Sequence, residues 1–384
     1  MKRKLRMGMV GGGAESFIGP VHRIGALMDN KIELVCGAFS SVPEKSKFEG
    51  QKLMLPPNRV YSTYQEMLNK ESTLPKNERI DFVSITTPNN THYEIAMAAL
   101  DRGFHVLCEK PLTTSLTKAK RLENKVEASS KLFGLMHNYT GYPMVKEAKH
   151  IVGNNGLGTL RRVVVEYPQG WLSSDVENRG NIQASWRVNP GIAGLSSCMG
   201  DIGTHCANLA EYITGLRITE VCSDLTTFVP GRKLDDDGSV LIRFGESTRG
   251  VLWASQVAVG QENGLNIRVY GENGSIQWQQ EEPNTLILRR QDKPAELRRA
   301  GSDFISEIAK SNSRIPAGHP EGYLETFANI YMEFANHLSN LVQGVTTDST
   351  FDYPTIHDGV HGMAFIEAVI NSTQNNNTWQ TISH

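Results

Sequence analysis

A cluster of three glycines near the start of the chain limits its folding more than any other feature. Gly11-Gly12-Gly13 follows a short apolar run, residues 5–10, and a stretch with helical spacing, residues 20–28, comes shortly after it. An apolar strand, a glycine turn and a helix in this order are typical of the first unit of a parallel sheet. Pro20 suits the first position of that helix, where its missing N–H costs nothing.

The first third of the sequence continues this alternation of strands and helices. Strands are expected at residues 33–39, 82–87, 105–108 and 132–137, and helices at residues 92–102 and 116–130. Strands that alternate with helices of about ten residues favour a parallel, doubly wound sheet. We therefore predict an α/β domain over residues 1–138.

After residue 138 the pattern changes to long segments in which polar and apolar residues alternate. Turn sequences such as Glu272-Asn273-Gly274 separate these segments. Strands are expected at residues 160–167, 221–228, 239–244, 250–257, 266–271, 275–279 and 285–290, and helices at 144–152, 201–214, 323–342 and 358–371. We predict an α+β domain over residues 139–384, built on a large, mostly antiparallel open sheet.

One face of that sheet is expected to pack in the core and the other to face solvent or a partner. A flat exposed sheet of this size commonly needs burial by another chain. A homodimer or homotetramer assembled through this sheet is therefore predicted.

Composition excludes several classes of protein. The formal net charge of −2 argues against a nucleic-acid partner, and no apolar run approaches the roughly 20 residues of a membrane span. The basic N-terminus lacks the apolar stretch and cleavage site of a secretory signal. The cysteines are odd in number and widely spaced, which fits a reduced protein. We expect a soluble, cytoplasmic enzyme.

The glycine cluster also predicts a ligand. Gly11 and Gly13 supply the first two glycines of the pattern G-x-G-x-x-G, and Ser16 stands at the third position. Gly19 follows later, so the loop is longer than the standard turn. Such glycines let the backbone approach a pyrophosphate at the positive end of a helix. We predict dinucleotide binding by the loop residues Gly11, Gly13, Ser16, Phe17 and Ile18.

The end of the second strand bears on the kind of dinucleotide. The acidic residue that commonly binds the adenine ribose is missing from Ala38-Phe39-Ser40-Ser41. Ser40 and Ser41 can bind either ribose hydroxyls or a 2′-phosphate, and Lys45 could reach the latter. No Arg follows directly, so NAD is favoured and NADP stays open.

Three further segments carry a resemblance to a known family. They are Pro88-Asn89-Asn90-Thr91-His92, Cys108-Glu109-Lys110-Pro111-Leu112 and Gly200-Asp201-Ile202-Gly203-Thr204-His205. In this order and spacing the chain resembles the Gfo/Idh/MocA family of sugar and inositol dehydrogenases over essentially its whole length. The stretches 167–171 and 318–323 look like a branch with levoglucosan, inositol and glucoside 3-dehydrogenases.

The resemblance implies a Rossmann domain, a cis Lys110–Pro111 peptide bond and further cofactor contacts. Those contacts are expected from Thr87, Pro88, Asn90, His92, Glu109, Lys110 and Asn138.

The chemistry of alcohol oxidation identifies candidate catalytic residues, because it needs a base and a cation near the developing alkoxide. Lys110 ends a parallel strand, where such sheets bind ligands, and a partly desolvated lysine lowers the pKa of a hydroxyl. Asp201 and His205 are four residues apart and share a helix face. We predict Lys110, Asp201 and His205 as catalytic, with His205 as the working general base. The sequence leaves open which of Lys110 and His205 takes the proton.

A sugar or polyol also needs hydroxyl-binding side chains and an aromatic face. Substrate contacts are predicted at Lys110, Asn138, Tyr142, Trp171, Arg187, Asp201, His205 and His319. For the aromatic residues among them, burial in the core is the alternative.

Two other patterns invite a metal site that we do not predict. His357 and His361 lack the glutamate of H-E-x-x-H, so an ordinary helix start near Asp358 is expected. Asp235-Asp236-Asp237 lack a calcium-binding loop and are expected to form a solvated hairpin turn.

These observations predict an NAD(P)-dependent dehydrogenase that oxidises a secondary ring hydroxyl of a sugar, glycoside or cyclic polyol by hydride transfer to nicotinamide. An NAD-using glycosidase or lyase with transient oxidation and a non-catalytic sugar or NAD(P) sensor are the alternatives. The sequence does not identify the substrate, the carbon oxidised or the physiological direction.

Overall fold

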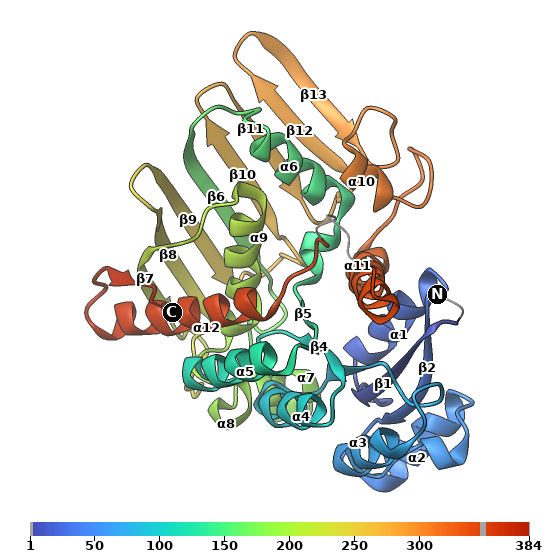
Figure 1. Cartoon of the computed structure of the whole chain (residues 1–384). Coiled ribbons are helices and arrows are strands. Elements are labelled where there is room, and N and C mark those ends of the chain that lie inside the picture. Colours follow the sequence, from blue (N-terminus) through green and yellow to red (C-terminus); the bar gives the residue numbers. More distant parts are fainter. Residues whose placement is uncertain (1–2, 346–350, 384) are drawn as a thin grey trace. The chain divides into compact units, whose positions relative to one another are not determined.

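The computed structural model describes residues 3–345 and 351–383, which fall into two compact units (Figure 1). The first unit holds the described parts of Met1–Thr113, Thr117–Asn138 and Tyr323–Gly359. The second holds those of Thr114–Leu116, Tyr139–Gly322 and Val360–His384.

A five-stranded parallel sheet forms the centre of the first unit, with the strand order β2-β1-β3-β4-β5. Its strands are β1 (Leu5–Gly11), β2 (Ile32–Ala38), β3 (Phe82–Thr86), β4 (His105–Glu109) and β5 (Phe133–Met136). The strands β3, β4 and β5 are buried at every position, as expected for a sheet that is covered on both faces. The predicted doubly wound α/β fold is confirmed.

Helices cover this sheet on both sides. They are α1 (Ile18–Met28), α2 (Pro43–Lys52), α3 (Tyr64–Thr73), α4 (Asn89–Asp101), α5 (Leu116–Ser129) and α11 (Tyr323–Gln343). The helix α1 starts before the predicted position, so Pro20 is its third residue and not its first. The missing N–H still costs little there, because the first four N–H groups of a helix lack partners within it.

One segment groups differently from the prediction. We expected residues 323–359 in the second domain, but the described residues of this range, 323–345 and 351–359, group with the first unit. The reason is α11, whose Phe327, Tyr331 and Phe334 are buried with strand residues such as Met7 in one apolar core. The helix also contacts α1 closely, since a Cβ on Gly25 would lie 2.7 Å from the Cβ of Phe327.

A nine-stranded sheet forms the centre of the second unit, in the order β13-β12-β11-β10-β6-β9-β8-β7-β14. Its strands are β6 (Leu160–Pro168), β7 (Glu220–Thr226), β8 (Asp237–Phe244), β9 (Thr248–Ser255), β10 (Asn266–Gly271), β11 (Gly274–Gln279), β12 (Thr285–Arg290), β13 (Lys293–Arg299) and β14 (Gln380–Thr381). Every pair is antiparallel except β6 and β9. The predicted mostly antiparallel sheet is therefore confirmed.

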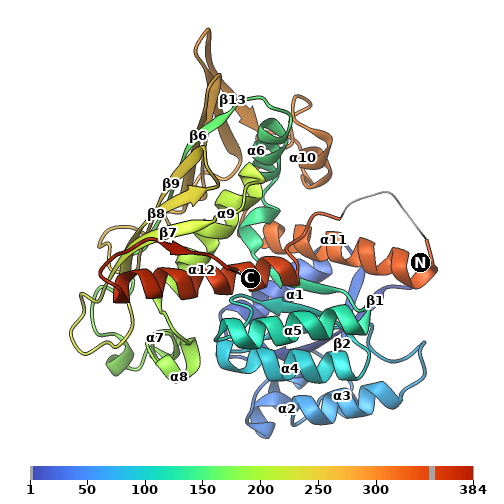
Figure 2. The ribbon, with the colours of Figure 1, turned by 60° about the vertical axis from the view of Figure 1, so that its left-hand side comes forward.

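The helices α6 (Pro143–Gly153) and α9 (Thr204–Thr214) pack on one face of this sheet (Figure 2). The shorter helices α7 (Ile182–Arg187), α8 (Pro190–Ala193) and α10 (Glu307–Ser311) precede or follow strands of the same unit. The helix α12 (Ile356–Gln374) is the last of the chain.

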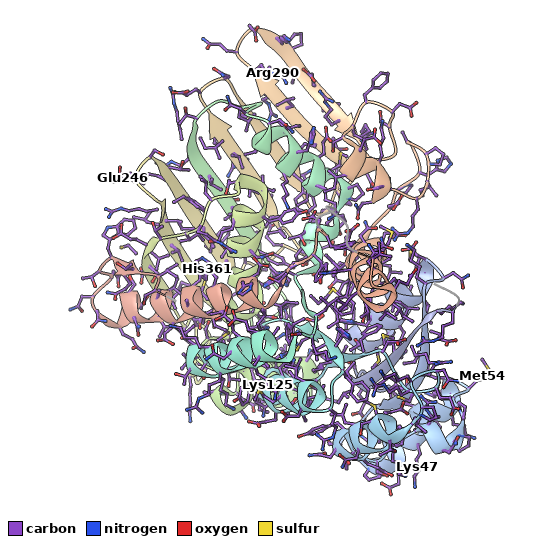
Figure 3. The ribbon with its side chains drawn as sticks, in the orientation of Figure 1. Lys47, Met54, Lys125, Glu246, Arg290 and His361 are labelled. Atoms are coloured by element: carbon purple, nitrogen blue, oxygen red, sulfur yellow. The ribbon has the colours of Figure 1, made fainter. Side chains whose placement is uncertain are left out.

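Figure 3 shows the side chains on the ribbon, with exposed and buried examples labelled. Met54, which is 90% exposed, and Lys47 project from the edge of the first unit, whereas His361 of α12 is buried. Within residues 3–345 and 351–383, no helix is both long and apolar enough to cross a membrane.

Candidate active site

The glycine loop lies at the carboxyl end of β1, where two other strand ends meet it. Gly11 and Gly12 have positive φ angles of 85° and 72°, which residues other than glycine rarely adopt. A Cβ on Gly11 would lie 2.9 Å from the carbonyl oxygen of Thr86, and one on Gly13 would lie 2.7 Å from that of Phe39. The loop therefore touches the ends of β2 and β3, and three of the segments predicted to bind a dinucleotide converge at this sheet edge.

Gly19 brings α1 directly onto the loop. A Cβ at this position would lie only 2.4 Å from the Cα of Gly12. Gly19 thus takes the role of the third glycine, which permits close packing of helix and strand. Ser16, which stands at the third position of the pattern, instead accepts a hydrogen bond from the N–H of Gly19 at 3.1 Å. These contacts fit a loop that leaves its backbone open to a pyrophosphate.

Arg23 supports the loop from inside the unit and was missed by the sequence analysis. Its Nη1 donates to the carbonyl oxygen of Gly12 at 2.6 Å, and its Nη2 donates to Glu49 Oε1 at 3.0 Å. The side chain is nearly buried. An arginine on a helix gives no sign in the sequence that it points inward.

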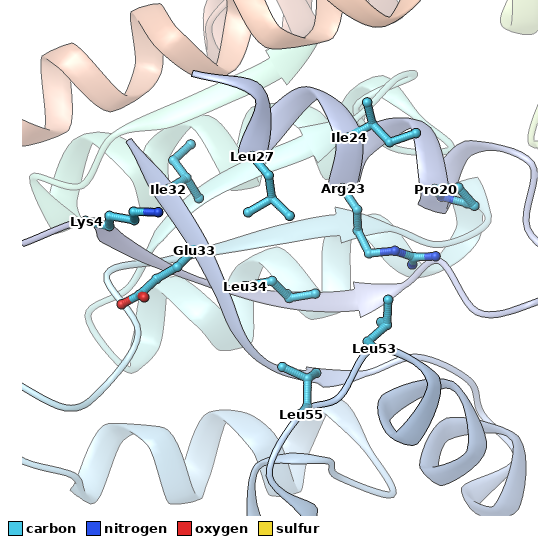
Figure 4. Close-up of a pocket in the computed structure, with 10 residues that line it drawn as sticks. All are labelled: Lys4, Pro20, Arg23, Ile24, Leu27, Ile32, Glu33, Leu34, Leu53 and Leu55. Carbon is cyan, nitrogen blue, oxygen red and sulfur yellow. The ribbon is translucent and has the colours of Figure 1, made fainter. Parts of the chain in front are cut away.

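Arg23 also lines a hollow of about 590 Å³ between α1, β2 and the segment that follows α2 (Figure 4). Most of its lining is apolar, with Ile24, Leu27 and Leu34 among the residues that form it. None of the predicted site residues is among the ten that line this hollow.

Ser40 and Ser41, which we predict to bind the adenine ribose, follow the end of β2. Ser40 is half-buried, and its Oγ accepts a bond from the N–H of Val42 at 3.1 Å. Ser41 is exposed. Lys45 forms an exposed ion pair with Glu15 of the glycine loop at 2.7 Å. The one cation that we considered for a 2′-phosphate thus already has a carboxylate partner.

His92 joins the ends of β3 and β4. Its ring nitrogens lie 2.8 Å from the carbonyl oxygen of Thr87 and 2.9 Å from that of Pro111, and the ring is fully buried. Burial lowers the pKa of His92, so the ring is neutral near pH 7 and donates to one of the two carbonyls. The Lys110–Pro111 peptide bond beside it is cis, as predicted. Asn90 lies half-buried in the first turn of α4.

Lys110 follows the last residue of β4 and is half-buried. Its N–H donates to Glu109 Oε2 at 3.1 Å, and Glu109 Oε1 lies 2.7 Å from His22 Nε2. Burial alone would raise the pKa of the Glu109 carboxyl, but the bond from His22 and nearby positive charge bring that pKa below its ordinary value. Asn138, buried in the same unit, donates to Thr326 Oγ1 at 3.3 Å.

In the second unit, Asp201 lies in a π-helical turn, Met199–Gly203, that leads into α9. The predicted helix over residues 201–214 therefore begins with a wider turn, a feature often found at functional sites. Asp201 Oδ2 accepts from Arg187 Nε at 2.8 Å and from Gln256 Nε2 at 3.0 Å. The structure thus brings two predicted residues, Asp201 and Arg187, together and adds Gln256, which no local sequence pattern indicates.

His205 is buried at the start of α9 against two tyrosines. Its ring centroid lies 4.7 Å from that of Tyr139 and 6.4 Å from that of Tyr167. The two hydroxyls bond to each other, and Tyr167 also donates to Asn263 Oδ1 at 2.7 Å. Burial raises the pKa of Tyr139 to about 12, so its hydroxyl stays protonated.

This hydrogen-bonded group extends to Trp171. Gln169 Nε2 donates to Asn263 Oδ1 at 2.8 Å, and Trp171 Nε1 donates to Gln169 Oε1 at 2.9 Å. Trp171 is 36% exposed, and the guanidinium of Arg187 lies 5.6 Å from its ring centroid. An aromatic face, a cation and several hydroxyl-binding groups therefore belong to one cluster.

Two further predicted substrate residues differ in their relation to this cluster. Tyr142 adjoins it, because its ring stacks on that of Tyr139 with a centroid distance of 6.3 Å. Tyr142 is buried against Trp278, with ring centroids 5.2 Å apart, as the core alternative expected. His319 lies in an exposed turn, where its Nδ1 is 3.1 Å from the carbonyl oxygen of Pro316.

The three adjacent aspartates correct the prediction of a solvated hairpin turn. Asp235 and Asp236 are only 8% and 1% exposed. The Oδ2 of Asp235 accepts from the N–H of Met199 at 2.8 Å, so this carboxylate holds the start of the turn that carries Asp201. Buried carboxylates and buried backbone N–H groups both need hydrogen-bond partners, and here they pair with each other.

The two histidines of the set-aside metal pattern have different carboxylate partners. His357 Nδ1 lies 2.7 Å from Glu123 Oε1, with Glu127 nearby, and His361 Nε2 lies 2.6 Å from Glu211 Oε1. Asp358 accepts from the N–H of Thr355 at 2.7 Å, which is the expected capped helix start.

Comparisons with known proteins extend these observations. Residues 5–137 match a family described as "Oxidoreductase family, NAD-binding Rossmann fold", and residues 145–277 match the "GFO/IDH/MocA C-terminal domain". An uncharacterized oxidoreductase of Bacillus subtilis is 33% identical, with 99% of this chain and 97% of the relative covered. Levoglucosan dehydrogenase of Pseudarthrobacter phenanthrenivorans is 30% identical over 54% of this chain and 57% of its own length.

A solved structure is similar over nearly the whole chain. The inositol dehydrogenase homolog of Azotobacter vinelandii in complex with NAD+ has a TM-score of 0.95 and 34% identity, covering 99% of this chain and 97% of its own. The same homolog complexed with NADH and myo-inositol has a TM-score of 0.91 and 33% identity, covering 99% and 98%.

Proposed function

Because the chain belongs to the Gfo/Idh/MocA family and is an oxidoreductase with an NAD-binding Rossmann domain, we propose that it oxidises a secondary ring hydroxyl of a cyclic polyol or sugar. The observation that carries the proposal is the cluster around Asp201, where a carboxylate, a guanidinium and an exposed tryptophan face belong to one unit. Such a mixture suits a ligand with many hydroxyls and a C–H face. A relative that binds NADH and myo-inositol supports this substrate class.

NAD is the proposed cofactor, and it supplies the hydride acceptor. The backbone of Gly11 and Gly13 would hold the pyrophosphate, and Ser40 and Ser41 the adenine ribose. The Glu15–Lys45 pair supports NAD over NADP, since an added phosphate would compete with a carboxylate for that lysine. The remaining predicted cofactor contacts, Ser16, Phe17, Ile18, Thr87, Pro88, Asn90, His92, Glu109, Lys110 and Asn138, are part of the same proposal.

In the proposed mechanism, His205 takes the proton of the substrate hydroxyl and Lys110 stabilises the developing alkoxide. Asp201 accepts a hydrogen bond from a neighbouring hydroxyl. Its carboxylate is oriented for this by Arg187 and Gln256, which both donate to Oδ2. Trp171 packs against the C–H face of the ring, and Asn138, Tyr142 and His319 complete the proposed substrate contacts.

The test is a screen of cyclic polyols, sugars and glycosides that follows reduced nicotinamide, with NAD and NADP in parallel. We expect turnover with NAD, and at least a 100-fold lower kcat in Lys110→Ala, since removing a charged stabilising group costs about 3 kcal/mol or more. Lys118→Ala, on the surface of α5, is the matched control.

Absence of turnover with every compound would contradict the proposal. Product formed without net NADH would instead indicate the glycosidase or lyase chemistry.

The uncovered face of the nine-stranded sheet supports a second part of the proposal, assembly into a homodimer or homotetramer. Leu241, 49% exposed, lies opposite Val251, which lies opposite Val164, so three apolar side chains adjoin on this face. At the other end, Ile287 lies opposite Leu297, which is 63% exposed. An apolar face of this kind is typical of an interface.

The cysteines support a cytoplasmic location as part of the proposal. All five are free thiols, and four of them are buried. Free thiols are typical of reducing compartments.

A further inference from the structure

A chain of buried hydrogen bonds lies behind Lys110 in the first unit. His22 Nε2 lies 2.7 Å from Glu109 Oε1, and His22 Nδ1 lies 2.8 Å from the hydroxyl of Tyr331. The same hydroxyl lies 2.8 Å from Ser84 Oγ. These four residues come from α1, β4, α11 and β3, and each is 8% exposed or less.

Burying these polar groups in the apolar core of the first unit costs free energy. Phe327 contacts the His22 ring edge-on with a centroid distance of 5.0 Å, and Phe82 packs on Tyr331. Polar groups buried among aromatic rings are stable only when they are hydrogen-bonded. Apolar residues of similar size would fill the same space without this requirement, so packing alone does not account for the chain.

The carboxylate of Glu109 fixes the direction of its hydrogen bond with His22. Glu109 is ionised near pH 7, because its pKa lies below the ordinary value, so His22 Nε2 donates to it. His22 Nδ1 is hydrogen-bonded to the hydroxyl of Tyr331, and that hydroxyl is hydrogen-bonded to Ser84 Oγ. The other carboxylate oxygen of Glu109 accepts the N–H of Lys110 at 3.1 Å. The chain thus ends on the backbone of Lys110.

A neighbour of His22 on α1 contacts the glycine loop. The next residue on α1 is Arg23, whose guanidinium binds the carbonyl oxygen of Gly12 at 2.6 Å. Of these two adjacent residues, Arg23 contacts the glycine loop, and His22 is linked to the backbone of Lys110 through Glu109.

We propose that His22 is a positioning residue: its bond to Glu109 fixes the backbone of Lys110 and couples that lysine to the glycine loop through α1. The residue acts through Glu109 and does not itself touch substrate. Only the catalytic role of Lys110 in this inference rests on the proposed function.

The test compares His22→Leu with His22→Gln, which keeps an N–H donor for Glu109. Val21→Ala is the matched control, because Val21 is a buried neighbour on the same helix without a polar partner. The first readout is hydrogen exchange of the Lys110 amide, resolved at that residue in the nucleotide-free protein. The second is NADH affinity by fluorescence, and the third is kcat and KM with a compound found in the screen.

In His22→Leu we expect the Lys110 amide to exchange about 10-fold faster than in the wild type, the equivalent of one lost hydrogen bond. We expect kcat to fall about 10- to 100-fold with KM for the polyol changed less than about 3-fold, since a positioning loss is felt mainly in the transition state. His22→Gln should recover part of both losses. In Val21→Ala the Lys110 amide and kcat should stay near wild type, although unfolding becomes easier.

Equal Lys110 exchange in His22→Leu and Val21→Ala would overturn the proposal, as would equal kcat in His22→Leu and His22→Gln. If His22→Leu does not fold, Tyr331→Phe removes only the hydroxyl that bonds to His22. Unchanged exchange of the Lys110 amide in Tyr331→Phe would then overturn it. If the wild type turns over no polyol, the proposed function fails, while the exchange readout still decides on His22.

Discussion

Arg187 and Gln256 both donate to one carboxylate oxygen of Asp201, and this leaves Asp201 oriented without the substrate. A carboxylate held by a guanidinium is both ionised and fixed in position. The ion pair also brings a cation close to Trp171 and Trp186, whose ring centroids lie 5.6 and 4.1 Å from the guanidinium. Arg187 therefore affects the charge and the shape of the candidate site together.

We predict that Arg187→Met lowers kcat/KM about 10- to 100-fold, because Asp201 loses one charged donor worth roughly 1.5–3 kcal/mol. Steady-state kinetics with a polyol from the screen would measure this loss. Arg179→Met, on an exposed turn in the same region, should leave kcat/KM unchanged. A similar effect in both variants would show that charge in this region, and not the bond to Asp201, matters.

His105 gives a prediction for pH. Its Nδ1 accepts from the N–H of Leu132 at 2.9 Å, and burial together with the charge of Lys131 lowers its pKa to about 4. The folded protein thus binds fewer protons here than the unfolded chain, whose histidine pKa is about 6.5. Stability therefore rises with pH between about 4 and 6.5 and is lost as the pH falls through that range.

We predict that His105→Asn, which keeps an oxygen acceptor for Leu132, reduces the slope of unfolding free energy against pH by up to about 1.4 kcal/mol per pH unit between pH 4.5 and 6. Urea unfolding at several pH values measures that slope. His150→Asn, an exposed position on α6, should keep the wild-type slope. A wild-type slope in His105→Asn would disprove the assignment.

At the scale of elements, Asp235 connects the start of β8 to the turn that leads into α9. The residue precedes β8, yet its carboxylate accepts the N–H groups of Ser197 at 3.1 Å and Met199 at 2.8 Å. These donors lie at the start of the turn that carries Asp201. Burial raises the pKa of Asp235, and the backbone bonds oppose that rise.

We predict that Asp235→Ala destabilises the protein by about 1–3 kcal/mol, the cost of buried donors left unpaired, and lowers kcat as well by loosening the turn of Asp201. Thermal unfolding and steady-state kinetics measure the two effects. Asp224→Ala, an exposed residue of β7, should change neither. A stability loss with unchanged kcat would show that the turn tolerates the missing cap.

The elements also show what the sequence could predict. Strands β1 to β12 and the long helices have clear apolar periods, and all of them were expected. The helices α2 and α3 were missed because their charged sequences have few apolar residues, and β13 was missed because most of its side chains are exposed.

Site residues were likewise predicted only where a local sequence pattern marks them. Gly11, Gly13 and Lys110 stand in recognisable local patterns, whereas Arg23, Gln256 and Asn263 take their partners from distant parts of the chain. Nothing in the local sequence signals such pairings.

For the whole molecule, the uncovered face of the nine-stranded sheet gives the clearest prediction. Leu241→Glu should reduce the molecular mass in solution to that of a smaller assembly, because a charge buried in an apolar interface costs several kcal/mol. Light scattering after size exclusion measures the mass. Leu341→Glu, on α11 and 48% exposed, is the matched control and should not change it. A wild-type protein that is already monomeric would sink the proposed assembly.

The return of α11 to the first unit has a consequence for synthesis. All five strands of the parallel sheet are encoded within the first 138 residues. The helix that covers part of this sheet, Tyr323–Gln343, is synthesised only after nearly all of the second unit. Until then Met7, Met9 and Phe82 lack their partners Tyr331 and Phe334. The nascent chain thus carries an exposed apolar patch throughout the translation of the second unit, and a product that stops before residue 323 would keep it permanently.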